Sequence, residues 1–173
     1  MEILQQFLIQ TPWYVWAILV WVLIRGVKAM TPGETTLVRM LTIPLIFTAW
    51  GLSDLVRLYG ASPEATALWL AGIAIGSVIG WWIVGRFAIT VDVATGVFHR
   101  PADMSLLPLL LTTFAIKYAF GVVGAVSPAL LAEPVFRISD LLLSGGFTGI
   151  FVGKFVRYCW LWHVARRPAA SAS

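Results

Sequence analysis

Two stretches decide the fold of this chain: Gly72-Ile-Ala-Ile-Gly76-Ser-Val-Ile-Gly80 and Gly145-Gly-Phe-Thr-Gly149-Ile-Phe-Val-Gly153. Each stretch, here named a glycine ladder, has a glycine at every fourth position inside an apolar segment long enough to cross a bilayer. On a helix these glycines form a stripe without side chains, along which a second helix can approach to backbone contact. The two stretches could pack on each other within one chain or form a homodimer seam, and we favour packing within the chain.

The composition indicates an integral membrane protein. The 173 residues are 60% hydrophobic and only 12% charged, and nine of them are tryptophans. A soluble domain of this length needs more charge to cover its surface, so the excess apolar residues must face lipid. The basic residues stand at the ends of apolar segments rather than in one patch, which argues against binding to nucleic acid.

Five apolar segments have the length of a transmembrane helix, which needs about 20 residues to cross ~30 Å of hydrocarbon. The first lacks the basic start and the cleavage site of a signal peptide, so we expect it to remain as a spanning helix. The sequence therefore predicts an all-α polytopic membrane protein with one helical domain over residues 1–167 and a disordered tail at 168–173. The expected spans are residues 7–24, 37–58, 65–84, 106–126 and 138–160.

The basic residues also predict the orientation in the membrane. Nine of the twelve Lys and Arg residues lie in the first loop, the third loop and the C-terminal end, which alternation of the spans places on one side. By the positive-inside rule this side is cytoplasmic. We therefore expect the C-terminus in the cytoplasm and the N-terminus outside.

The third loop differs from the other connections. Over residues 89–100 it alternates β-branched with polar residues, which predicts a short cytoplasmic β-hairpin. Asp92 and Gly96 bracket the turn, and Gly96 is expected to have a positive φ. We regard this hairpin as a connector folded over the helix ends rather than as a docking edge for a partner strand.

The second and third spans resemble the fourth and fifth as an internal repeat. Pro44-Leu-Ile-Phe-Thr48 is similar to Pro108-Leu-Leu-Leu-Thr112, and each copy continues into one of the glycine ladders. Parallel repeats are related by an axis along the membrane normal, so the two glycine-bearing spans should run parallel. The first span would be an added helix outside the repeat.

Lys117 is the strongest candidate for a functional residue, because it lies near the middle of the fourth span. A cation at that depth costs about 3 kcal/mol unless it is paired or hydrated. Asp54, at almost the same place in the other repeat, is the expected partner, and Asp140 is a second. Asp54 could instead pair with Arg57, three residues further along the helix. A structural ion pair is favoured over a site for a proton, an ion or an anionic headgroup, and over a lysine that only snorkels.

The sequence contains no motif of a known catalytic or metal site. His99 and His163 are both expected at the cytoplasmic surface, which excludes a bis-histidine haem site within the membrane. Cys159 is the single cysteine, so the chain has no CxxC redox pair. We therefore expect no enzyme activity, no metal and no cofactor.

Three short motifs resemble a family of small, uncharacterised bacterial inner-membrane proteins with about five spans. They are Thr11-Pro12-Trp13-Tyr-Val-Trp16, Asp92-x-x-Thr95-Gly96-x-Phe98 and Lys117-Tyr118. The resemblance implies a bacterial plasma membrane but transfers no activity to any residue. The layout is also distantly similar to small membrane proteins linked with cytochrome c maturation, although the missing cysteine pair leaves that link without a chemical basis.

Two non-enzymatic functions follow from these observations. The first is a structural or accessory subunit that assembles with itself or with another membrane protein through its glycine faces, surrounded by membrane lipid. The second is a minimal transporter or channel for an ion, a proton or a small solute that uses Lys117 and Asp54. The small number of polar residues inside the spans favours the accessory subunit. An intramembrane enzyme acting on lipid has the least support, because no acid–base pair is visible.

Overall fold

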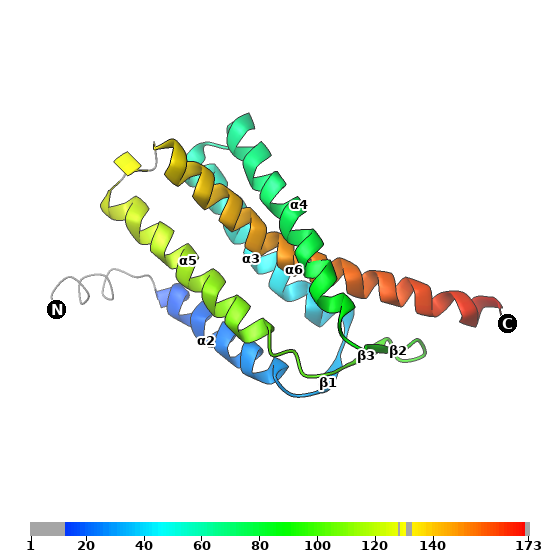
Figure 1. Ribbon diagram of the computed structural model, residues 1–173. Helices are drawn as coiled ribbons and strands as arrows, with labels where there is room; N and C mark the ends of the chain where they lie inside the picture. The colour runs from blue at the N-terminus through cyan, green and yellow to red at the C-terminus, as the bar shows by residue number, and fades with distance from the viewer. Residues whose placement is uncertain (1–12, 128, 131–132, 172–173) are drawn as a thin grey trace. The chain divides into compact units, whose positions relative to one another are not determined.

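The computed structural model of this chain describes residues 13–127, 129–130 and 133–171 and is mostly helical. The elements divide into two compact units, one containing α2 and α5 and the other containing the remaining helices and strands. The helices are α2 (Trp13–Ala29), α3 (Leu37–Tyr59), α4 (Pro63–Gly85), α5 (Leu106–Val126) and α6 (Pro134–Ser171), and the strands are β1 (Gly33–Thr35), β2 (Thr90–Asp92) and β3 (Val97–Arg100) (Figure 1).

Four of the described helices, α3 to α6, are long and apolar enough to cross a membrane. This finding supports the predicted class of helical membrane protein. The expected first span, 7–24, begins outside the described residues, and its described part belongs to α2, whose 17 residues continue to Ala29.

Helix α6 is longer than the sequence predicts. Its 38 residues begin before position 138 and continue to Ser171, into the segment 168–173 that was expected to be disordered. At 1.5 Å per residue the helix is about 57 Å long, almost twice the ~30 Å of hydrocarbon. Hydropathy marks only the apolar part of a helix, so it could not show how far α6 continues after that part ends.

The turn between α3 and α4 follows from its local sequence. Gly60 ends α3 with φ 61°, a left-handed conformation in which its N–H caps the helix carbonyls. The Ser62 hydroxyl then accepts a hydrogen bond from the N–H of Ala65, and Pro63 occupies the first turn of α4. The two helices are thereby joined by a tight turn.

The predicted β-hairpin is confirmed. Strands β2 and β3 pair antiparallel, and Gly96 has φ 72° in the turn between them. The Asp92 carboxylate organises this turn, because it accepts hydrogen bonds from the Thr95 hydroxyl (2.7 Å) and the Ala94 N–H (2.9 Å).

A third strand was not predicted. β1 pairs antiparallel with β3, with Gly33 opposite Arg100, and the sheet order is β1-β3-β2. Three residues are too few for a periodicity signal, so only the tertiary pairing defines β1. This pairing places the start of α3 and the end of α4 at the same end of their unit. Two successive spans that run in opposite directions require this arrangement.

The sheet is anchored on α6 by an apolar cluster in which Phe98 is central. Phe98 of β3 is wholly buried and meets Tyr158 edge-on with 5.6 Å between ring centroids. Trp162, one turn further along α6, covers the same ring at 6.0 Å. At mid-helix, Phe47 of α3 stacks on Phe151 of α6 at 4.8 Å, so α3 and the sheet both pack on α6.

The second unit is formed by α2 and α5. Val22 and Leu110 are fully buried in it, and Gly26 lies so close to Leu107 that an added Cβ would press against that side chain. The N–H of Asp103 donates to the carbonyl of Ala29 at 2.9 Å, which ties the segment before α5 to the end of α2.

Candidate functional site

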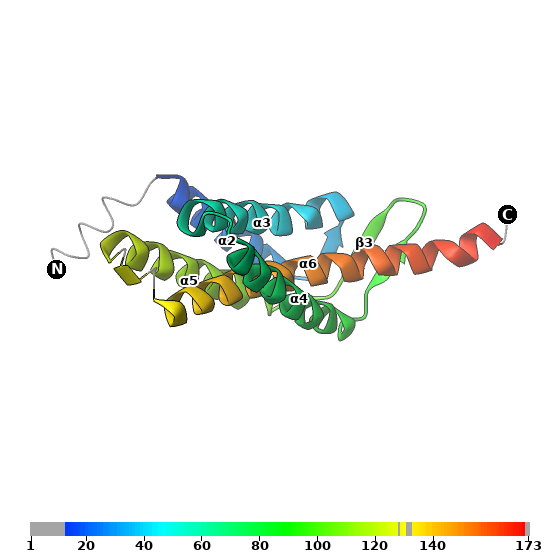
Figure 2. The same ribbon diagram turned by 90° about the horizontal axis from the view of Figure 1, so that it is seen from above.

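Helices α4 and α6 cross at backbone contact (Figure 2). A Cβ added to Gly76 would overlap the carbonyl of Gly146, and one added to Gly149 would overlap the carbonyl of Ile73. The contact involves all members of both ladders, Gly72, Gly76, Gly80, Gly145, Gly149 and Gly153. Of the two arrangements that the sequence allowed, packing within the chain is the one observed.

The crossing helices are parallel and share one register. Gly72 meets Gly145 at the crossing, and Glu64 forms an ion pair with Arg137 at 2.7 Å near the helix starts. The two residues of each pair are the same number of positions apart in the sequence, so the register of α4 against α6 does not shift between the two pairs. The parallel arrangement is the one that the internal repeat predicts, whereas the duplication itself stays a prediction.

A partly buried hydrogen bond lies at the end of this unit where α4 and α6 begin. The Tyr59 hydroxyl donates to Oδ2 of Asp140 at 2.8 Å, and Asp140 is only 6% exposed. An apolar cluster packs below it, made of Leu55, Ala65, Trp69 and Leu141. A carboxylate in such surroundings needs donors, and Tyr59 supplies one that sequence reasoning missed, because nothing in the local pattern connects two residues so far apart.

The remaining predicted site residues belong to different units of the chain. Lys117 is 6% exposed on α5, whereas Asp54 is partly buried and Arg57 exposed on α3. A pair between Lys117 and Asp54 would join the two units, and it stays a prediction. Asp140, the second expected partner of Lys117, is the acceptor of the Tyr59 hydroxyl.

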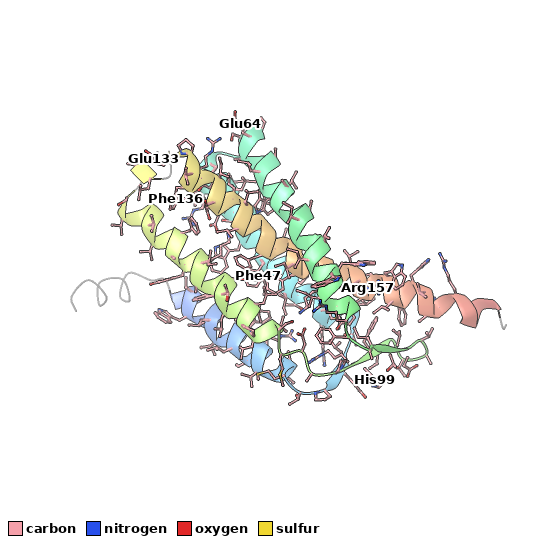
Figure 3. The ribbon with its side chains drawn as sticks, viewed as in Figure 1. Phe47, Glu64, His99, Glu133, Phe136 and Arg157 are labelled. Carbon is pink, nitrogen blue, oxygen red and sulfur yellow. The ribbon has the colours of Figure 1, made fainter. Side chains whose placement is uncertain are left out.

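A basic and aromatic cluster lies where the end of α4 meets the middle of the second half of α6. The guanidinium of Arg157 lies over two indoles, 4.7 Å from the ring centroid of Trp81 and 4.3 Å from that of Trp160. The two indoles meet edge-on at 5.8 Å. Figure 3 labels Arg157 between the end of α4 and α6. The aromatic and basic residues near the end of the fifth span were visible in the sequence, but their convergence on Arg157 was not.

Within residues 13–127, 129–130 and 133–171, no group of three His, Cys, Asp or Glu side chains is placed to hold a metal ion. No protein-family model, no curated protein and no solved structure matches the chain. The function therefore has to be argued from the residues themselves, and the resemblance to bacterial inner-membrane proteins stays a prediction.

Proposed function

We propose that the protein is a non-enzymatic structural or accessory subunit of the bacterial inner membrane, with five spans and a cytoplasmic C-terminus. The backbone contact between α4 and α6 carries this proposal. Helices that meet through glycine and carbonyl groups leave no room for a solute between them. The pair is suited to a rigid support rather than to a transport path.

A partner would have to bind a surface other than the glycine ladders, because packing within the chain already uses them. The sheet and the part of α6 from Tyr158 onward, here named the platform, offer such a surface. Phe98 fixes the platform as one body by its contacts with Tyr158 and Trp162. Because α6 is about 57 Å long, its end extends beyond the hydrocarbon into water.

Native mass spectrometry of the full chain, released from nanodiscs made from its own membrane, tests this proposal. We expect a defined homo-oligomer or a complex with another membrane protein. Phe98→Ala, which loosens the platform, should lose the added mass, whereas Leu45→Ala, at a position 56% exposed on α3, should keep it. A monomer without bound protein in all three samples would contradict the proposal.

Transport is the second candidate, and the burial of Lys117 in an apolar helix favours it. Proteoliposomes with a pH-sensitive dye inside can report proton flux driven by a membrane potential. If Lys117 serves transport, Lys117→Met should abolish flux and leave the unfolding midpoint unchanged, while Lys28→Met, at an exposed position on α2, should keep flux. Loss of folded protein in Lys117→Met would instead indicate a structural ion pair.

A further inference from the structure

Arg157 takes the next position in the glycine ladder of α6. Residues 145, 149 and 153 are glycines in contact with the backbone of α4, and the following member of this four-residue series is Arg157. Its terminal nitrogen Nη2 lies 3.9 Å from where a Cβ on Gly85 would stand, so the side chain extends toward the end of α4. A long basic side chain therefore occupies the position directly after the last glycine that is in backbone contact with α4.

The guanidinium of Arg157 is in cation–π contact with two indoles. Trp81 and Trp160 both lie within the ~6 Å range of cation–π contact, one on each helix. Indole faces attract a cation but accept none of its in-plane N–H bonds. Nε is buried and has no hydrogen-bond partner in the described part of the chain, while the side chain as a whole is partly exposed. A ligand with paired acceptors can therefore approach the outer nitrogens.

A span of α6 that begins at Pro134 would place the cluster at the depth of lipid phosphates. Arg157 is about 35 Å along α6 from Pro134, at 1.5 Å per residue. The hydrocarbon core is ~30 Å thick, so a span that begins at Pro134 carries Arg157 just past its far boundary. Tryptophan and arginine side chains are both favoured at this level.

The charge around Arg157 is positive. Lys154 is one turn before it, and Arg86 lies over Trp82 at 3.5 Å on the end of α4. The described carboxylates of the neighbouring sheet are engaged elsewhere: Asp92 in its own turn, and Glu34 with His99 at 3.5 Å. Basic side chains at the end of α4 and on α6 therefore favour an anion at this cluster.

We propose that the wedge formed by Arg157, Trp81 and Trp160 binds the phosphate of an anionic phospholipid headgroup in the leaflet on the sheet side. The guanidinium edge donates two parallel N–H bonds to two phosphate oxygens, a geometry that a lysine cannot match. The indoles pack against the glycerol and the first methylene groups. The proposal rests on α4 and α6 crossing the bilayer, as proposed above, and not on any protein partner.

Retention of lipid by the intact protein tests the wedge. Wild-type protein in nanodiscs with equal amounts of phosphatidylglycerol and phosphatidylcholine should retain phosphatidylglycerol in native mass spectra. Arg157→Gln should reduce this retention about tenfold or more, because a bidentate charge-assisted contact is lost. Arg86→Gln removes an exposed cation that lies over a single indole at the same end, and retention should change less than about twofold. Equal losses in both variants would show that only the general positive field attracts lipid and would overturn the proposal.

A measurement on the wild-type protein does not depend on how well Arg157→Gln folds. In neutral detergent, phosphatidylglycerol should raise the thermal unfolding midpoint, because a ligand that binds only the folded state stabilises it. Phosphatidylcholine and inorganic phosphate should leave the midpoint unchanged. An equal rise with inorganic phosphate would assign the wedge to the free ion and overturn the lipid assignment, and no rise with phosphatidylglycerol would overturn the site itself.

Discussion

A single methyl group at the crossing of α4 and α6 should separate the two helices. Gly149→Ala adds a Cβ that would stand 2.8 Å from both the carbonyl carbon and the Cα of Ile73. Carbon atoms in ordinary contact are about 3.5–4.0 Å apart, so the helices must move by about 1 Å. The obstructing atoms are backbone, and no change of rotamer can relieve the overlap.

The expected loss of stability can be estimated from this displacement. A gap of about 1 Å forfeits up to half of the dispersion energy of the contacts that it opens, and overpacking in cores typically costs about 1–3 kcal/mol. Replacing a helical glycine by alanine stabilises the folded state by about 1 kcal/mol, because alanine loses less backbone entropy on folding. Because the clash lies in backbone and affects the whole crossing, we expect a net destabilisation of about 2 kcal/mol.

The neighbouring glycine provides the matched control. A Cβ on Gly146 would lie 4.0 Å from the carbonyl oxygen of Gly72, which is ordinary contact, so Gly146→Ala should keep only the entropic gain. Unfolding of both variants in mixed micelles with increasing SDS, followed by far-UV circular dichroism, gives the two free energies of unfolding. If Gly149→Ala were as stable as Gly146→Ala, the backbone contact between α4 and α6 would be refuted.

Three other changes report on other contacts. Phe98→Ala should destabilise the sheet by about 3–5 kcal/mol, because it removes a wholly buried ring, and hydrogen exchange over residues 90–100 should accelerate. Tyr59→Phe should lower the free energy of unfolding by about 1–3 kcal/mol, because the buried Asp140 carboxylate loses its 2.8 Å donor. Hydrogen bonds from the Thr95 hydroxyl and from backbone N–H groups favour the charged carboxylate and hold the pKa of Asp92 below its usual value. The turn is therefore stabilised above the pKa of Asp92 in the unfolded chain, and this stabilisation is lost as pH falls through the lower folded-state pKa. The Thr95 amide resonance should titrate with a midpoint below the ordinary pKa of an aspartate.

Each of these three predictions would be contradicted by a specific result. Unchanged exchange in Phe98→Ala would mean that the ring does not hold the sheet on α6. A Tyr59→Phe variant as stable as wild type would show that Asp140 does not depend on this donor. Asp92→Asn keeps an acceptor oxygen but cannot titrate in this range, so a Thr95 midpoint that persists in that variant would assign the titration to another group.

The glycine ladders show which part of the helix packing can be predicted from the sequence. Their four-residue spacing marks one face of a helix, and in lipid such a face indicates close packing wherever it meets a second helix. The identity of that second helix depends on the path of the chain between the two ladders. The same limit applies to Arg157, which the sequence presents as one of several basic residues at the end of a span. Only the crossing of α4 and α6 brings Trp81 onto its guanidinium.

By itself the sequence determined the mostly helical class, the position of most of the membrane-length helices and the turn at Gly96, because each depends on local hydropathy, helical period or the φ of one residue. The tertiary structure alone decided that the two ladders face each other in parallel, that β1 completes the sheet and that Tyr59 serves Asp140. These contacts join residues far apart in the chain. Their existence depends on how the helices cross, and no local pattern encodes a crossing.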